Sequence, residues 1–243
     1  MKTLVIIPSR MSAIRLPGKP LLKINGLSII SHVSKKAEEA NIGDVIVATE
    51  DQEIVDDVKR NGFNAILTSN QHKTGTDRVY EAFKKLNIND IDLVMNLQGD
   101  EPAIDIDDIK SLNDKMANNN SNLGTLAAKI EENKNLENEN IVKVITEKSL
   151  EEDHFPKAVS FSRKSEQVEN IYHHIGIYCY TKVCLEKFVK LKQSKNEIEN
   201  RLEQLRALDN NIDINVALAK SSPKGVDTKE DYLALKKIME YKN

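Results

Sequence analysis

The stretch MKTLVIIPSRMSAIRLPGKPLL, residues 1–22, joins a short apolar run to a basic loop. The run from Leu4 to Ile7 is typical of a buried parallel strand. The loop after it holds a glycine and three cations: Gly18, Arg10, Arg15 and Lys19. Glycine lets the backbone approach a ligand closely, and the cations neutralise phosphate oxygens. The stretch therefore predicts an α/β fold with a phosphate-binding loop after its first strand, with a plain surface loop as the alternative.

This loop departs from the common glycine-rich nucleotide loops. Lys19 follows Gly18, but Pro20 stands where a Walker P-loop has Ser or Thr. No GxGxxG pattern follows the first strand either. The sequence therefore disfavours ATPase and dinucleotide-binding functions.

The composition narrows the class of protein. The 243 residues are 40% hydrophobic, which suits one sizeable domain with a core, and the net charge of −3 disfavours a nucleic-acid-binding surface. Cys179 and Cys184 are expected to be buried thiols in a reducing cytoplasm. The apolar run at residues 4–7 is too short for a signal peptide or a membrane span, so a cytoplasmic protein without membrane contact is expected.

Strand and helix patterns alternate over the first 120 residues. Strands are predicted at 2–7, 44–49, 64–67 and 91–97, and helices at 28–41, 51–60, 75–87 and 105–118. Such alternation implies right-handed crossovers and a mainly parallel sheet flanked by helices.

The pattern is less regular in the second half of the chain. Strands are predicted at 123–130, 141–146, 157–161 and 171–180, and helices at 197–209 and 228–241. No repeat and no independent domain boundary is evident. We expect these strands to extend the same sheet, with a small additional arm or lobe.

Three polar groups are predicted at strand ends or helix starts, where ligands of open α/β sheets bind. Asp100 follows the apolar strand 92–98 and Gly99, which suits either a Mg²⁺ ligand or the cap of the next helix. The segment 74–78, TGTDR, suits either an anion or base edge, or an ordinary helix start. In the segment 225–231, GVDTKED, Asp227 is either a ligand or a cap, and Thr228 is a second possible cap.

These motifs resemble the 3-deoxy-manno-octulosonate cytidylyltransferase (CMP-KDO synthetase) family. Its pattern of an apolar strand, P-[AS]-R, a spacer and R-L-P-G-K-P-L is matched by Pro8 to Arg10 and Arg15 to Leu21. Its N-x-Q-G-D-E-P, S-G-T-E-R and G-V-D-T-x-E-D motifs are matched as well, with Asp77 in place of a Glu. The resemblance implies a single Rossmann-like nucleotidyltransferase domain over 1–243. Residues 1–122 would mainly bind the nucleotide, and 123–243 would bind the acceptor and dimerise.

The resemblance also implies roles for individual residues on the nucleotide side. Asp100 and Asp227 would hold Mg²⁺, and with Arg10 and Lys19 they would be the catalytic residues. The implied nucleotide-binding residues are Pro8, Ser9, Arg10, Arg15, Gly18, Lys19, Gly75, Thr76, Arg78 and Gln98.

On the acceptor side the match is less complete. The run 171–180, IYHHIGIYCY, and the helix around 202–208 match family motifs, and core packing is the alternative explanation of both patterns. The implied acceptor-binding residues are Gln98, Arg163, His174, Tyr178, Glu203 and Gln204. Departures from the family pattern occur directly after Arg163 and at three further positions: His173, Lys195 and Asn200.

The activity implied by the resemblance is transfer of CMP from CTP to KDO, with release of pyrophosphate. Its setting would be a cytoplasmic homodimer that serves lipopolysaccharide biosynthesis. Two alternatives remain open from the sequence. The acceptor could be a related sugar acid, 8-amino-KDO or a nonulosonate, or the chain could be a degenerate nucleotide-binding protein without activity.

Overall fold

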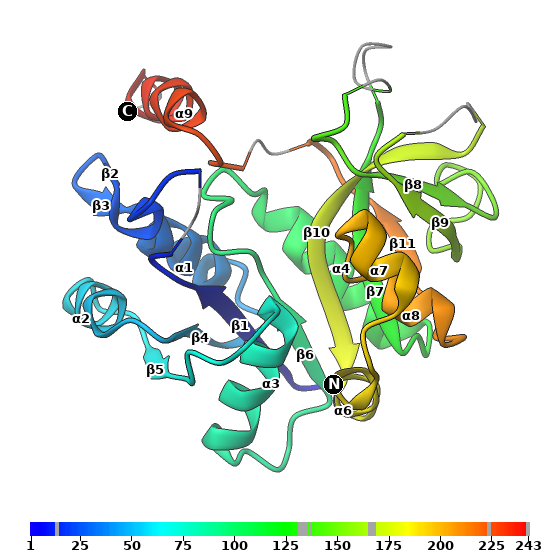
Figure 1. The fold of residues 1–243 in the computed structure, drawn as a ribbon, viewed down its shortest axis with the longest axis horizontal. Coiled ribbons are helices and arrows are strands. Elements are labelled where there is room, and N and C mark those ends of the chain that lie inside the picture. The colour runs from blue at the N-terminus through cyan, green and yellow to red at the C-terminus, as the bar shows by residue number, and fades with distance from the viewer. Residues whose placement is uncertain (13–14, 131–135, 137, 165–168, 223–224, 242–243) are drawn as a thin grey trace. The chain divides into compact units, whose positions relative to one another are not determined.

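Strand β1 (Thr3–Ser9) forms from the apolar run at the start of the chain. It pairs in parallel with β4 (Gly43–Thr49) and with β6 (Leu93–Asn96), and β5 (Ala65–Leu67) pairs in parallel with β4. Leu4 to Ile7 are at most 1% exposed, as expected for a strand covered on both faces. The four strands therefore follow the order β6-β1-β4-β5 (Figure 1).

The computed structural model describes residues 1–12, 15–130, 136, 138–164, 169–222 and 225–241. The described residues divide into two compact units. One contains those of 2–109 and 223–243, and the other contains those of 110–222 together with Met1. The C-terminal segment thus returns to the unit that contains the first strand.

Helices connect the strands of the first unit. They are α1 (Ile29–Glu39), α2 (Gln52–Arg60), α3 (Gly75–Leu86) and, from the end of the chain, α9 (Lys229–Tyr241). Helix α4 (Ile106–Asn118) begins in this unit and continues into the second. The predicted strands and helices of the first 120 residues are confirmed with boundaries within two residues. A 3-10 turn, η1 (Lys19–Leu21), and a short hairpin of β2 (Lys23–Ile24) and β3 (Leu27–Ser28) were not predicted.

The second unit is built around β7 (Leu123–Ala128), which pairs in parallel with β11 (Asn215–Leu218) and antiparallel with β10 (Ile171–Thr181). Strand β8 (Lys143–Thr146) pairs antiparallel with both β10 and β9 (Ala158–Ser162). The β8–β9 pair corresponds to the arm expected in the second half of the chain. Strand β11 and helix α6 (Lys182–Lys190) were not predicted.

The single helix predicted at 197–209 is wrong. Two helices occupy this region, α7 (Lys195–Asn200) and α8 (Leu205–Asp209), and Arg201 between them has a φ of 54°. Glu197 caps the start of α7, and its carboxylate also accepts hydrogen bonds of 2.8 and 2.5 Å from Arg206 in α8. Both side chains are almost fully buried. This buried bidentate pair joins the two short helices, a tertiary contact that helical periodicity does not reveal.

The fold is thus α/β, with mainly parallel strands and flanking helices, as predicted. Among the described residues, no helix is both long and apolar enough to cross a membrane.

Candidate active site

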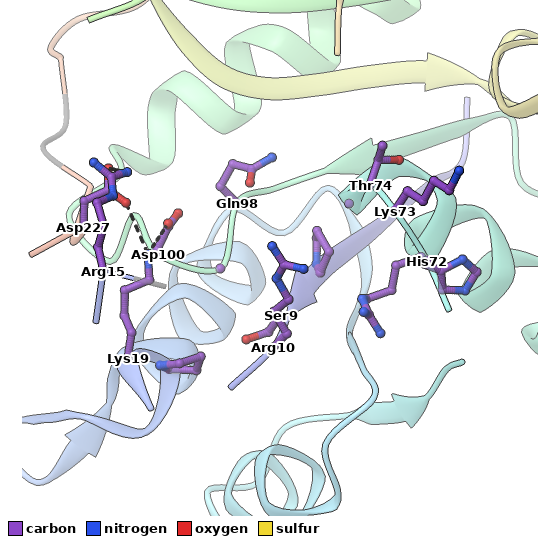
Figure 2. Close-up of a pocket in the computed structure, with 15 residues that line it drawn as sticks. Ser9, Arg10, Arg15, Lys19, His72, Lys73, Thr74, Gln98, Asp100 and Asp227 are labelled. Atoms are coloured by element: carbon purple, nitrogen blue, oxygen red, sulfur yellow. Dashed lines mark hydrogen bonds and ion pairs between the residues drawn. The ribbon is translucent and has the colours of Figure 1, made fainter. Parts of the chain in front are cut away.

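A cavity of about 400 Å³ opens beyond the carboxyl ends of β1 and β6 in the first unit. Most of the nucleotide-side residues predicted from the sequence line it: Pro8, Ser9, Arg10, Arg15, Lys19, Gly75, Arg78, Gln98, Asp100 and Asp227. Pro20, His72, Lys73 and Gly99 also line it and were not predicted, and Thr74 of the segment 74–78 lines it as well. Gly18 and Thr76 do not line it. The cavity therefore collects residues from distant parts of the chain (Figure 2).

The cavity has two ends of different chemistry. Arg15, Lys19, Asp100 and Asp227 lie together at one end, here called the carboxylate end. Residues 72–75 form the other, here called the loop end, and Ser9, Arg10 and Gln98 lie between them (Figure 2).

Lys19 occupies the centre of the carboxylate end. Its Nζ lies 2.6 Å from Oδ2 of Asp100 and 3.5 Å from Oδ1 of Asp227. Arg15 contacts the other oxygen of Asp227 at 2.8 Å. The side chain of Lys19 is 11% exposed, so these charges interact in a partly desolvated setting. One ammonium therefore connects two carboxylates that are 127 residues apart in the sequence.

The backbone around Gly18 directs Lys19 into the cavity. Gly18 has a φ of 72°, which favours glycine, and its N–H donates to the carbonyl of Met11 at 3.1 Å. The turn η1 starts at Lys19 immediately afterwards. Gly18 therefore turns the chain directly before η1.

A backbone hydrogen bond places the two carboxylates side by side. The N–H of Val226 donates to the carbonyl of Asp100 at 2.9 Å. Val226 itself is fully buried in an apolar cluster with Ile24, Ile29 and Leu235. Packing of the C-terminal segment against the first unit thus fixes the position of Asp227.

The capping roles considered for the two carboxylates are filled by other residues. Thr228 and Asp231 cap the start of α9 reciprocally: Asp231 N–H donates to Thr228 Oγ1 at 3.1 Å, and Thr228 N–H donates to the Asp231 carboxylate at 2.9 Å. Before α4, the Asp105 carboxylate accepts from the N–H of Asp107 at 2.8 Å. Asp100 and Asp227 are therefore not needed as helix caps.

Gly99 allows the strand end to approach the first strand closely. A Cβ atom at this position would lie 2.9 Å from the carbonyl oxygen of Pro8 and 3.1 Å from Cδ1 of Ile30. The close approach brings the segment that carries Gln98 and Asp100 against the segment that carries Ser9.

Glu101 is a further acidic residue that the sequence analysis did not single out. Burial is the main cause that raises its pKa to about 8, and the negative charges of Asp100 and Asp227 add to this effect. Its Oε2 atom is buried without a hydrogen-bond partner. In the sequence, Glu101 is marked only by its position next to Asp100. That position does not show that the Glu101 side chain is buried.

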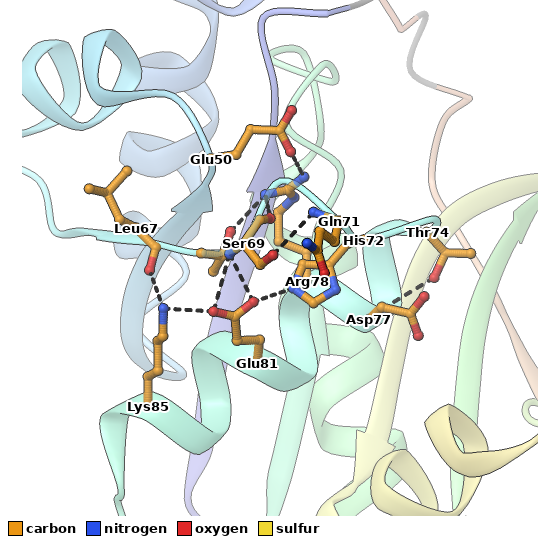
Figure 3. Close-up of polar contacts among 11 residues, drawn as sticks. Glu50, Leu67, Ser69, Gln71, His72, Thr74, Asp77, Arg78, Glu81 and Lys85 are labelled. Atoms are coloured by element: carbon orange, nitrogen blue, oxygen red, sulfur yellow. Dashed lines mark hydrogen bonds and ion pairs between the residues drawn. The ribbon is translucent and has the colours of Figure 1, made fainter.

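The loop end is formed by the turn before α3 and by the start of that helix. Thr74 is the N-cap, since its Oγ1 accepts from the N–H of Asp77 at 3.2 Å, so capping explains this residue. The guanidinium of Arg78 is buried, donates to Thr68 Oγ1 at 2.7 Å and pairs with Glu50 (Figure 3). Thr76 is buried next to Asn96, whose Nδ2 lies 3.5 Å from its hydroxyl.

The acceptor-side residues His174 and Tyr178 lie in the second unit on β10. Their ring centroids are 5.5 Å apart, and the two residues flank a register shift between Ile175 and Tyr178. His174 is buried, its Nε2 lies 3.0 Å from Oγ1 of Thr125, and burial lowers its pKa to about 3. His174 is therefore a neutral imidazole held by a hydroxyl.

Arg163, Glu203 and Gln204 lie elsewhere in the second unit. Arg163 donates to the carbonyls of Glu139 at 3.1 Å and Asn200 at 3.4 Å. Gln204 is buried directly before α8, and Glu203 lies 3.6 Å from the guanidinium of Arg206. Residues 165–168, where the sequence departs from the family pattern after Arg163, lie outside the described residues.

The chain is similar to known cytidylyltransferases over most of its length. A sequence model of the cytidylyltransferase family matches residues 4–214. A 3-deoxy-manno-octulosonate cytidylyltransferase of Rhodopseudomonas palustris is 42% identical over 241 residues, 98% of each chain. One of Brucella canis is 40% identical over 234 residues, which are 95% of this chain and 93% of its own length.

Solved structures give the same result. A CMP:2-keto-3-deoxy-manno-octonic acid synthetase complexed with CTP superposes with a TM-score of 0.91 and 32% identity over 100% of both chains. A putative glucose-1-phosphate thymidylyltransferase from Bacillus anthracis shares the fold alone, with a TM-score of 0.70 and 15% identity over 98% of this chain and 95% of its own. The chain therefore belongs to the cytidylyltransferase family, and within it to the 3-deoxy-manno-octulosonate cytidylyltransferases.

Proposed function

We propose that the protein transfers CMP from CTP to 3-deoxy-D-manno-octulosonate, giving CMP-KDO and pyrophosphate. The observation that carries the proposal is the carboxylate end of the cavity, where two cations and two carboxylates contact one another. A triphosphate would complement the two cations of this set, and a divalent cation would complement its two carboxylates. Membership of the family supplies the identity of the nucleotide and of the sugar acid.

The cations of the first loop would bind the triphosphate. Arg15 and Lys19 exchange their carboxylate partners for phosphate oxygens without leaving the cavity, and Arg10 lines the same cavity between its two ends. Lys19 is the least exposed ion-pairing group of the carboxylate end, so its charge has the strongest effect on a developing negative charge.

The donor set at the carboxylate end fits Mg²⁺. Asp100 and Asp227 both contact one ammonium, and carboxylate oxygens are hard ligands of the kind that Mg²⁺ binds. No group of three or more potential protein ligands occurs within the part of the chain that the structure describes. Two carboxylates that leave the remaining positions to phosphate and water oxygens are typical of Mg²⁺ sites in nucleotide enzymes. When bound, the ion would neutralise phosphate charge.

The reaction is a displacement at phosphorus. The anomeric hydroxyl oxygen of the sugar forms a bond to the α-phosphorus, the bond from that phosphorus to the bridging oxygen breaks, and pyrophosphate leaves with that electron pair. The hydroxyl proton passes to solvent. Such a transfer depends on positioning and charge neutralisation more than on covalent chemistry, which is what the residues lining this cavity supply.

For the sugar acid we propose the second unit. Arg163 would pair with the sugar carboxylate, and His174 and Tyr178 would contact the sugar itself. Glu203 and Gln204 are proposed as further acceptor contacts. Because the sequence departs from the family pattern after Arg163, 8-amino-KDO or a nonulosonate is the alternative acceptor.

Pyrophosphate release tests the proposal. The protein is incubated with CTP and MgCl₂ and with KDO, 8-amino-KDO or sialic acid in turn. Turnover with KDO, abolished by EDTA and restored by Mg²⁺, is the expected result. Turnover with only one of the other acids would mean that this acid, and not KDO, is the acceptor. CTP binding without any turnover would favour a nucleotide-binding protein without activity.

We also propose a homodimer located in the cytoplasm, where CTP is available, and a role in lipopolysaccharide biosynthesis. Exposed apolar side chains in the second unit, Val159, Val183 and Ile198, are between 57% and 70% exposed and are candidates for the dimer contact. Sedimentation equilibrium measures the mass of the particle and tests the dimer directly.

A further inference from the structure

Helix α3 presents a row of charged side chains to the loop in front of it. Arg78, Glu81 and Lys85 are spaced by three and four residues, so they lie on one side of the helix. All three contact the segment 67–72, which leads into the loop end of the cavity (Figure 3). Side chains of α3 thus hold the segment that leads into the cavity wall.

Glu81 makes the largest number of these contacts. The N–H of Ser69 donates to both of its carboxylate oxygens, at 3.1 and 2.9 Å. Nε2 of His72 lies within hydrogen-bond distance of one oxygen, and the Lys85 ammonium lies 2.6 Å from the other. Glu81 therefore ties both Ser69 and His72 to α3.

The charge of Glu81 is maintained by these contacts. Burial by itself raises the pKa of the carboxyl, but the hydrogen bonds from Lys85, Ser69 and His72 outweigh it and lower the pKa to about 2. An ionised acceptor forms stronger hydrogen bonds than a neutral one. The loop is thus held by charge-assisted contacts.

We propose that Glu81 is a positioning residue for nucleotide binding: it fixes the loop 69–72 so that His72 to Gly75 form a preset wall of the cavity. The inference rests on the proposed function. Glu81 does not itself line the cavity, so it acts through the loop. A loop that is already ordered loses less conformational entropy when a ligand binds, which increases affinity.

The position of the wall determines which part of the nucleotide depends on Glu81. If the carboxylate end takes the triphosphate, the nucleoside part extends toward the loop end (Figure 2). Loosening the loop should then weaken binding of CTP but not binding of inorganic triphosphate. A general loss of folding would weaken both ligands to the same degree.

Titration calorimetry with MgCl₂ measures both affinities for the unchanged protein and for Glu81→Gln. We expect the Kd for CTP to rise about tenfold and the Kd for inorganic triphosphate to change less than twofold. Lys35→Met is the matched control, because it breaks an exposed pair with Glu39 four residues further along α1, outside the cavity lining. Its Kd for CTP should stay within twofold.

Other outcomes separate the inference from the proposed function. An unchanged CTP affinity in Glu81→Gln, or equal losses for both ligands, would overturn the inference while the unchanged protein still binds CTP. If the unchanged protein does not bind CTP, the proposed function fails and the inference fails with it. Should Glu81→Gln not fold, Glu81→Asp shortens the side chain that reaches Ser69 and His72, and its CTP affinity must fall selectively for the inference to stand.

Discussion

The two ends of the cavity use ion pairs in different ways. At the carboxylate end, Arg15 and Lys19 pair with Asp227 and Asp100, and all four side chains line the cavity. At the loop end, Arg78 pairs with Glu50 and Glu81 pairs with Lys85, and three of these four side chains lie outside the lining. The first set can exchange partners with a ligand, whereas the second set holds the backbone in place.

This difference predicts different consequences for substitutions at the two ends. Changes at the carboxylate end should reduce turnover with little effect on folding, because Arg15 and Asp227 are half exposed and exposed pairs contribute little to stability. Changes at the loop end should lower stability, because the guanidinium of Arg78 is almost fully buried.

The largest effect is expected for Asp227→Asn. Loss of one preorganised charge at the reacting phosphates should lower kcat by about 10²–10³-fold, while the melting temperature stays close to that of the unchanged protein. Pyrophosphate release measures the first quantity and calorimetry the second. Asp213→Asn is the control, because Asp213 forms an exposed pair with Lys157 outside the cavity lining. Normal turnover of Asp227→Asn would remove this residue from the catalytic set.

Arg78→Met tests the loop end. The side chain of Glu50 is 18% exposed, and removal of its partner should destabilise the protein by about 3 kcal/mol, near the lower limit for broken buried pairs. Urea unfolding gives the free energy of unfolding. Lys2→Met breaks the exposed pair with Asp90 and should lower stability far less than Arg78→Met. Equal losses in the two variants would mean that the two kinds of ion pair do not differ as proposed.

Acidification should give a smaller effect at the loop end. The pKa of Glu81 is about 2 in the folded protein and near its usual 4.5 in the unfolded chain. Between these values the unfolded chain binds more protons, so stability is lost as the pH falls from about 5 toward 2. With allowance for partial exposure, the loss from this group is about 2 kcal/mol. Unfolding at several pH values should show a shallower acid decline for Glu81→Gln, and identical slopes would contradict this assignment.

The first unit could be predicted well because its signals are local. The strand at residues 3–9 and the loop with Lys19 follow from an apolar run and a neighbouring basic segment. The later strands and helices of this unit follow in the same way from local hydrophobic patterns. The positions of Asp100 and Asp227 at the cavity agree with the expectation that ligands bind beyond strand ends.

What could not be predicted depends on contacts between distant residues. Periodicity runs through 197–209 without interruption, but the buried pair of Glu197 and Arg206 requires a break at Arg201. Likewise, Glu81 has the spacing of an ordinary helix residue, and only the fold brings Ser69 and His72 to it. The acceptor residues remain predictions for the same reason, since their roles depend on how a sugar acid meets them.

The hydrogen bond from Val226 to Asp100 has a consequence for the order of events during protein synthesis. A ribosome completes Lys19 and Asp100 long before it reaches Asp227, and at typical elongation rates the interval is on the order of ten seconds. Throughout that time a nascent chain can form β1, β4 and β6 but cannot assemble its pair of carboxylates. If Asp227 is catalytic, as proposed, the enzyme is expected to remain inactive on the ribosome until α9 is free to pack.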